Sequence, residues 1–432
     1  MDLRKMNEKK INYEFLKLFA FGILIGIFAG GISTLYRCII SFCEKFLMKI
    51  NAVAAGSNGK IGFIILMFCG IFVVSIITAY IKKWVPLCGG SGIPQVKAEI
   101  DGKIVTNPVK VILGKIIGGT LSALCGMSVG REGPSIQLGA MTGKLFSKFY
   151  NAQDAENLFL TGGAAAGLSA AFNAPIASVM FSIEEIHGKI NKRLTCVILT
   201  SAITADFLSK IILANKRVFN FELDHVIQMD KYYHLIIFGV IISILGIFYL
   251  YLMEKFSALN DNLKMPFQLK MLPYFAISAL VFLCIPYISG GGGFYMSKLM
   301  SDEFGVKLLI ALFFIKLFFS IISFTSGIPG GIFFPILVLG ANIGMIYGKL
   351  FYPEFTNNFM ILGMAGMLTA VVRSPVTSVL LIYEMTGNIT FLLPLGTVSI
   401  ITYIIPNFIG YRPVYDYLYD RVLLKNKVDI KS

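Results

Sequence analysis

Long apolar segments alternate with short polar connections along almost the whole chain. Their length suits helices in a membrane, but several are short or are interrupted by Gly and Pro, which predicts tilted and discontinuous helices rather than a simple bundle of spans. The apolar segments cover residues 13–50, 61–81, 107–127, 135–149, 158–183, 196–214, 234–253, 272–288, 306–325, 331–350, 359–383 and 390–409. An all-α membrane protein follows from this pattern, with a short amphipathic end near residues 410–424.

The polar stretches divide the chain into two membrane units. We predict an N-terminal tail at residues 1–12, a first membrane unit at 13–214, a polar connector at 215–233, a second membrane unit at 234–424 and a C-terminal tail at 425–432. Nothing that resembles a soluble regulatory domain follows the second unit in this sequence, so we expect no control by a nucleotide bound to such a domain.

The two membrane units repeat each other at a nearly constant offset. Residues 130–143 align with 331–344 at an offset of 201, and residues 165–184 align with 365–384 at an offset of 200. Repeats of this kind are typical of transporter folds, whose binding site lies at the repeat interface near the membrane midplane. The alignment alone leaves open whether the repeats run parallel or inverted.

Composition excludes a soluble domain, because 56% of the 432 residues are hydrophobic and only 14% are charged. The net charge of +14 comes with basic clusters at both ends. In a membrane protein these clusters favour cytoplasmic termini, by the positive-inside rule, over nucleic-acid binding.

The seven cysteines lie mostly in apolar segments without metal-type spacing. We therefore expect no disulfide framework, no metal site and no cofactor.

Three short segments share one order of residues: glycine, then proline, then the start of a helix. Glycine lets the backbone approach a ligand closely, and proline opens a helix whose first N–H groups are free. Three such ends together would bind an anion through partial charges, without a Lys or Arg that would hold it too tightly. Each segment taken alone is an ordinary helix start. The segments are Gly90, Ser91, Gly92, Ile93 and Pro94; Gly130, Arg131, Glu132, Gly133 and Pro134; and Gly331, Ile332, Phe333, Phe334 and Pro335.

The second of these segments places two ionisable side chains, Arg131 and Glu132, inside an apolar region. Ionisable groups at membrane depth are costly and are therefore functional candidates. A helix over 135–149 would begin just after Glu132 and place its positive end beside that carboxylate. The alternative is a buried Arg–Glu pair at a helix start. In the repeat Glu132 aligns with Phe333, so the repeat itself does not require this carboxylate.

The motifs GSGIP, GREGP and GIFFP, followed by Tyr415, resemble the selectivity-filter motifs of the CLC family of chloride channels and chloride–proton exchangers. The block GGAAAGLSAAFNAPIASVMFSIEE, at residues 162–185, is similar to that family as well, and the resemblance covers nearly the whole chain in order. It implies two inverted repeats of short, tilted helices in each subunit. It also implies a homodimer with one pore per subunit in the cell membrane, of the prokaryotic type without cytosolic regulatory domains.

The resemblance also implies roles for single residues. Ser91 and Tyr415 would donate hydroxyls to a central anion, and Ile332 and Phe333 would donate backbone N–H groups. Ser91 taken alone could equally be a helix cap and Tyr415 an interfacial aromatic residue.

Two glutamates fall on the proton-handling positions of the family. Glu132 matches the gating glutamate, whose carboxylate competes with the anion and also forms the outer proton site. Glu185 matches the inner proton glutamate of the exchangers. The alternative for Glu185 is a helix-end carboxylate in contact with the cytoplasm. Glu184 recurs as Glu384 in the repeat and is therefore interpreted as structural.

The expected function is exchange of chloride for protons across the lipid bilayer. The alternative is a passive chloride channel, gated by voltage or pH, with the same filter. An intramembrane enzyme that uses Glu132 as an acid or base is disfavoured, because the sequence has no HExxH, G-x-S-x-G or P-loop motif. We thus expect no enzyme activity, with chloride and protons as the transported ions and no nucleic acid as a partner.

Overall fold

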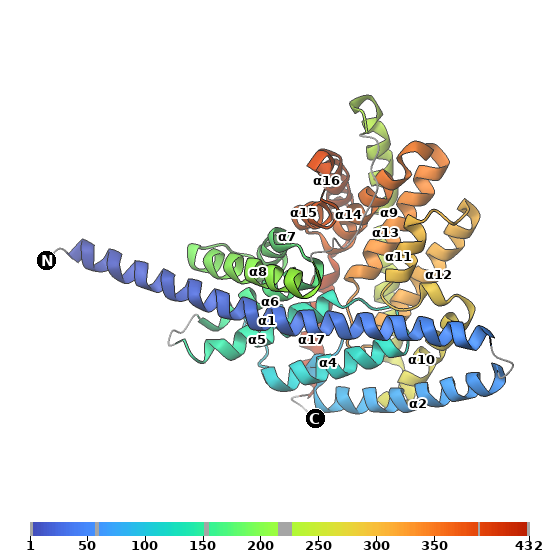
Figure 1. Cartoon of the computed structure of the whole chain (residues 1–432), viewed down its shortest axis with the longest axis horizontal. Coiled ribbons are helices and arrows are strands. Elements are labelled where there is room, and N and C mark those ends of the chain that lie inside the picture. Colours follow the sequence, from blue (N-terminus) through green and yellow to red (C-terminus); the bar gives the residue numbers. More distant parts are fainter. Residues whose placement is uncertain (1–2, 57–59, 151–154, 215–226, 388, 430–432) are drawn as a thin grey trace.

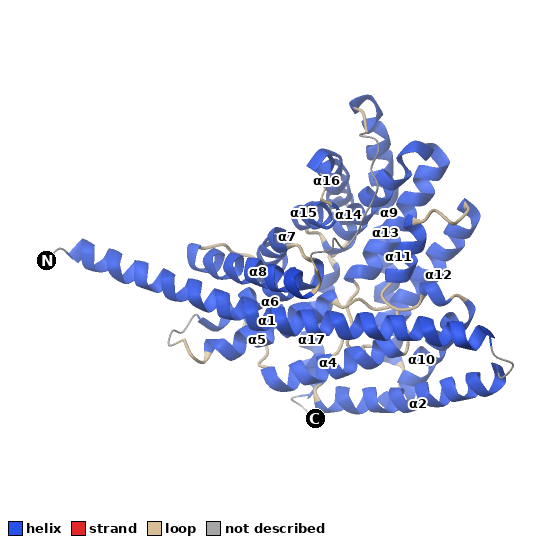
Figure 2. Cartoon of the chain, viewed as in Figure 1, coloured by secondary structure: helices blue, strands red, loops and turns tan. Residues whose placement is uncertain are grey.

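The computed structural model describes residues 3–56, 60–150, 155–214, 227–387 and 389–429. Within these residues the chain forms 17 α-helices joined by short turns, and no β-sheet (Figures 1 and 2). The all-α fold predicted from the apolar pattern is confirmed. Of the predicted polar connector, residues 215–226 lie outside the described residues.

The helices fall into two series that follow the repeat. The first series comprises α1 (Leu3–Gly56), α2 (Lys60–Trp84), α3 (Ile93–Ile100), α4 (Pro108–Leu124), α5 (Glu132–Ser147), α6 (Ala155–Phe172), α7 (Pro175–Phe181) and α8 (Lys192–Ile212). The second comprises α9 (Tyr232–Asn262), α10 (Phe267–Cys284), α11 (Gly293–Met300), α12 (Val306–Thr325), α13 (Phe333–Phe351), α14 (Thr356–Val372), α15 (Pro375–Thr386), α16 (Leu392–Phe408) and α17 (Val414–Asp429). Helices α2–α8 thus correspond in order to α10–α16.

The two series meet at equivalent residues that run in opposite directions. Gly130 and Gly331 exchange two backbone hydrogen bonds, of 2.6 and 2.7 Å, in an antiparallel bridge. The residues before α5 and α13 have the same backbone angles, φ −94° and ψ −11°, at Arg131 and Ile332. Equivalent segments that cross antiparallel at one point are related by a two-fold rotation. The fold therefore consists of two inverted repeats of short, discontinuous helices.

Close glycine contacts fix the helices that follow the bridge. In the first repeat Gly139 of α5 lies against the backbone of Gly163 in α6, and a Cβ atom at either position would overlap the other's carbonyl oxygen. Gly340 of α13 and Gly363 of α14 make the same contact in the second repeat. Small residues let membrane helices approach to backbone contact, which holds the first turns of α5 and α13 in place.

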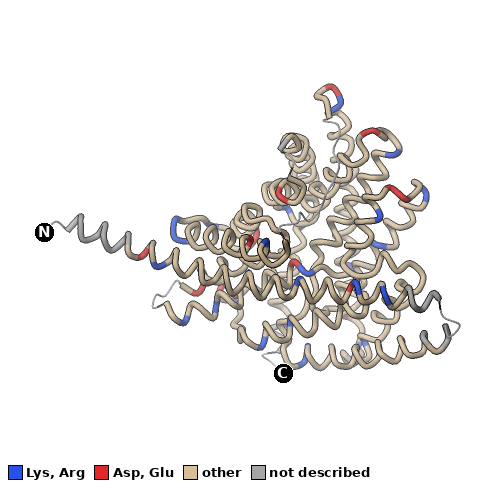
Figure 3. Tube along the Cα trace, in the orientation of Figure 1, with Lys and Arg blue, Asp and Glu red and all other residues tan. Residues whose placement is uncertain are grey.

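The arrangement of apolar and charged residues suits a multi-pass membrane protein. Among the described residues, seven helices are long and apolar enough to cross a membrane: α1, α2, α8, α9, α12, α13 and α14. Charged residues lie mainly in loops and near helix ends, and long central stretches of the helices carry none (Figure 3). Large apolar side chains such as Phe207 and Ile404 are exposed, as expected for residues that face lipid.

Several helix boundaries differ from the predicted ones. Helix α5 begins at Glu132 rather than at residue 135, because an acidic residue is favourable at the positive end of a helix. The predicted apolar segment 158–183 is two helices, since Asn173 adopts a left-handed conformation (φ 56°) and Pro175 opens α7. Helix α1 already begins at Leu3, and α17 continues to Asp429, so both predicted tails are partly helical.

Candidate anion pathway

The three glycine-rich segments converge at one place through their own backbones. The N–H of Gly90 donates to the carbonyl of Ile328 at 2.9 Å, and the N–H of Gly330 donates to the carbonyl of Gly90 at 3.1 Å. The bridge between Gly130 and Gly331 joins the second and third segments. The first turns of α3, α5 and α13 therefore meet. Their free N–H groups form a region of positive potential without a formal charge.

Two buried hydroxyl groups, those of Ser91 and Tyr415, lie at this region with no partner among the described residues other than a contact with each other. The side chains of Ser91 and Tyr415 are buried and lie near each other. Neither hydroxyl makes a hydrogen bond of acceptable geometry with the described residues. Buried polar groups are nearly always paired, so two unpaired donors beside three helix starts are the sign of a site for an anion. Gly133 makes room for this geometry, because a Cβ atom there would overlap the Ser91 hydroxyl.

Aromatic contacts fix Tyr415 relative to the start of α13. Phe333, the first residue of α13, is fully buried, and its ring centroid lies 5.5 Å from that of Phe172 and 5.9 Å from that of Phe181. Phe181 in turn makes an edge-to-face contact with Tyr415, at 6.4 Å. The rings therefore form a continuous apolar wall beside the hydroxyl of Tyr415 and the first N–H groups of α13.

Glu132 lies at the same convergence and forms a long ion pair with Arg131. Its side chain is buried, with one carboxylate oxygen 3.9 Å from Nε of Arg131 and the other without a hydrogen-bond partner among the described residues. Arg131 instead donates to the hydroxyl of Ser41 at 2.6 Å. The carboxylate folds back over Gly130, where a Cβ atom would overlap it. The ion pair with Arg131 is therefore too long to hold the carboxylate by itself, and one carboxylate oxygen has no hydrogen-bond partner among the described residues.

Glu185 forms a second buried acidic centre, in the turn that continues α7. One carboxylate oxygen lies 3.6 Å from Nζ of Lys97, and the other accepts a 3.3 Å hydrogen bond from Ser374. Lys97 also donates to Asp416 at 3.1 Å. Because Asp416 follows Tyr415 directly, this network ties the acidic centre to the backbone that carries the anion-site hydroxyl.

Glu184 and Glu384 have a different, reciprocal role. Glu184 accepts hydrogen bonds from the backbone N–H and the hydroxyl of Thr377, at 2.9 and 2.6 Å, and so caps the start of α15. Glu384 accepts bonds from the N–H groups of Ile176 and Ala177, at 3.1 and 2.8 Å, and caps the start of α7. Each repeat thus caps a helix of the other, which is the structural role that the repeated position indicates.

Two buried lysines beside the pathway were not singled out from the sequence. Nζ of Lys115 in α4 donates to the carbonyl of Gly90 at 2.9 Å, and Nζ of Lys316 in α12 donates to that of Gly290 at the same distance. Both lysines are fully buried, and each holds the glycine turn that precedes a short helix, α3 or α11. Their offset of 201 in the sequence is the repeat offset, and that was the signal that could have found them.

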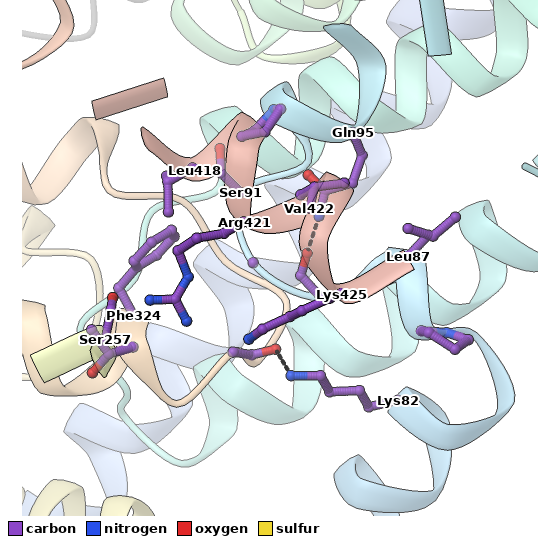
Figure 4. A pocket seen from close by; sticks show the side chains of 16 residues that line it. Lys82, Leu87, Ser91, Gln95, Ser257, Phe324, Leu418, Arg421, Val422 and Lys425 are labelled. Atoms are coloured by element: carbon purple, nitrogen blue, oxygen red, sulfur yellow. Dashed lines mark hydrogen bonds between the residues drawn. The ribbon is translucent and has the colours of Figure 1, made fainter. Parts of the chain in front are cut away.

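A cavity of about 210 Å³ leads to Ser91 from the side of α17 (Figure 4). Its wall carries three basic side chains, Lys82 from α2 and Arg421 and Lys425 from α17, which reach toward the same region. Lys82 donates to the carbonyl of Gly327 at 3.0 Å, while Arg421 and Lys425 share the carboxylate of Asp261 at 2.7 and 3.1 Å. Asp261 is one acidic partner for three basic side chains. The cavity therefore keeps a positive potential that attracts small anions.

Inverted repeats, free helix starts at the midpoint and a basic cavity define a membrane protein that conducts or transports anions. The chain belongs to the voltage-gated chloride channel family, CLC, whose sequence model matches residues 71–407.

Named relatives of the chain match over most of their length. The chain is 29% identical to the H(+)/Cl(−) exchange transporter ClcA of Vibrio cholerae serotype O1 (strain M66-2), over 94% of this chain and 90% of that protein. The crystal structure of a slow cyanobacterial Cl−/H+ antiporter has the same fold, with a TM-score of 0.89 and 24% identity, and covers 95% of this chain and 99% of that chain. A eukaryotic CLC transporter has a TM-score of 0.78 and 19% identity over 94% of this chain and 74% of that one.

Proposed function

We propose that this protein exchanges chloride for protons across the cell membrane. The similarity over 94% of the chain to a named H(+)/Cl(−) exchange transporter supports exchange over a passive channel. The observation that carries the proposal is the placement of Glu132, whose buried carboxylate lies at the three helix starts that would bind the anion. Chloride and the charged carboxylate compete for this site, so protonation of Glu132 and entry of the anion are coupled.

Four groups would hold the central chloride: the hydroxyls of Ser91 and Tyr415 and the N–H groups of Ile332 and Phe333. The unpaired, buried state of both hydroxyls supports this assignment. Glu185 would take up protons on the other side of the site, and its burial beside Lys97 supports that role. The termini would be cytoplasmic, and two copies of the chain would form a dimer with one pathway each; this part rests on the basic chain ends and the resemblance of the motifs.

Replacement of Glu132 tests the proposed function. Glu132→Gln keeps the shape of the side chain but cannot gain or lose a proton, so we expect chloride flux in liposomes to continue while coupled proton movement disappears. Glu303→Gln is the matched control, because Glu303 is an exposed carboxylate that pairs with Lys298 away from the pathway. Proton movement that stays coupled to chloride in Glu132→Gln would contradict the proposal.

A further inference from the structure

A second carboxylate, that of Glu44, shares a small cavity with Glu132. The cavity has a volume of about 40 Å³, and its polar lining comes from Glu44 of α1, from Arg131 and Glu132, and from the backbone of Gly291 and Gly293. A water molecule needs roughly 10–15 Å³ of such space and two or more polar partners. The cavity therefore has room for at least one water molecule between the two carboxylates.

The glycine turn before α11 holds Glu44 at this cavity. One carboxylate oxygen of Glu44 accepts a 3.2 Å hydrogen bond from the N–H of Gly291. Gly290 has a positive φ of 70°, and a Cβ atom there would lie only 3.0 Å from the same oxygen. The hydrogen bond from Gly291 thus holds the Glu44 carboxylate against the glycine turn.

The two carboxylates differ in their access to solvent. Glu132 is 1% exposed, so in this conformation its proton has no direct route to the surrounding water, whereas Glu44 is partly exposed. Among the described residues that line the cavity, Glu44 is the only acidic side chain besides Glu132. Glu44 is therefore the group in this cavity that could exchange protons with Glu132.

We propose that Glu44 relays protons between the outer solution and Glu132. In the inward step the O–H bond of protonated Glu44 breaks and its proton passes to the bridging water. That water gives one of its own protons to the Glu132 carboxylate, where a new O–H bond forms. The water ends unchanged, and Glu44 takes up another proton from outside. The relay rests on the proposed exchange of chloride for protons.

Several charged side chains surround Glu44, so replacing it changes the local electrostatic potential as well as any transfer of protons. The negative charges of Glu44 and Glu132 repel each other, and Arg131 lies at the same cavity. Lys316 of α12 also acts electrostatically on Glu44, while Tyr36 and Arg37 of α1 act on Glu132. The negative charge of Glu44 at this cavity could also slow chloride by repulsion. The test therefore has to distinguish transfer of protons from repulsion of the anion.

A double-variant experiment makes this distinction. Glu44→Gln and Glu44→Asp are made in the parent protein, Glu44→Gln is also made in the Glu132→Gln variant, and Glu303→Gln is the control. Proton and chloride fluxes are recorded in liposomes over a series of external pH values. A positioned proton-transfer group accelerates transfer by about 100-fold or more, and water replaces part of that effect. We therefore expect Glu44→Gln to slow coupled exchange by about tenfold, most strongly at alkaline external pH.

The relay predicts a specific pattern across the variants. In the parent background, Glu44→Gln slows protons and chloride equally and leaves their ratio unchanged, and Glu44→Asp restores most of the rate. In the Glu132→Gln background, Glu44→Gln leaves chloride flux unchanged, since no proton is transferred there. The Glu303→Gln control behaves as the parent.

Three other results would overturn the relay. Faster chloride flux of Glu44→Gln in the Glu132→Gln background, with parental proton rates in the parent background, would mean that Glu44 only repels chloride. An equal loss of flux in both backgrounds would mean a structural role. A parental exchange rate in Glu44→Gln would refute the relay while the proposed function stands, whereas a parent protein that moves no protons would refute the proposed function itself.

Discussion

Replacement of Gly133 by alanine is expected to weaken anion binding although it replaces none of the side chains proposed to contact the anion. The added Cβ atom would overlap the hydroxyl oxygen of Ser91 and lie 2.9 Å from its carbonyl oxygen. Rotation of the serine side chain alone cannot relieve both contacts, so the start of α3 must shift away from α5. Overpacking of this kind costs about 1–3 kcal/mol.

The expected loss of chloride-binding free energy is similar in size to this overpacking cost. A hydrogen bond to a charged group contributes about 1.5–3 kcal/mol, so displacement of the Ser91 hydroxyl should weaken chloride binding by about 10- to 100-fold. Isothermal titration of the purified protein with chloride measures this directly. Gly396→Ala in α16 is the matched control, because a Cβ atom at that position meets no atom within 4 Å. Parental chloride affinity in Gly133→Ala would refute the assignment of the site to the contact between α3 and α5.

Three further variants separate the transport roles from the structural ones. Glu185→Gln should stop proton transport while chloride flux survives, and proton transport at the parental rate would make Glu185 structural. Tyr415→Phe keeps the ring contacts but removes the unpaired hydroxyl, so chloride affinity measured by titration should fall about tenfold; an unchanged affinity would exclude the hydroxyl as a ligand. Glu384→Ala removes the caps on Ile176 and Ala177, which should cost about 1 kcal/mol and lower the melting temperature by about 1 °C; unchanged melting would contradict the capping role.

The architecture could be predicted because the internal repeat and the Gly–Pro segments are visible directly in the order of residues. Gly130 and Gly331 stand at equivalent positions, and their backbones pair in the structure. The apolar pattern likewise predicted the membrane helices. What it did not predict is where helices divide, as at Asn173, whose left-handed conformation ends α6 inside a segment that the pattern indicates as one apolar run.

Contacts between distant segments were beyond prediction from the sequence pattern. Lys97 lies in α3 and Asp416 in α17, and only the folded chain shows that one ammonium group serves both Asp416 and Glu185. Glu44 stands near the end of an apolar run and has no distinctive neighbours in the sequence. Its place beside Glu132 depends on the glycine turn before α11, which lies at the same small cavity and hydrogen-bonds Glu44.

Chloride-driven proton transport tests the central claim most directly. The purified protein is reconstituted in liposomes, a chloride gradient is imposed, the membrane potential is clamped with an ionophore, and external pH is recorded. Coupled exchange predicts that protons move against their own gradient for as long as chloride moves down its gradient. Chloride flux without any proton movement would contradict exchange and would make the protein a passive chloride channel.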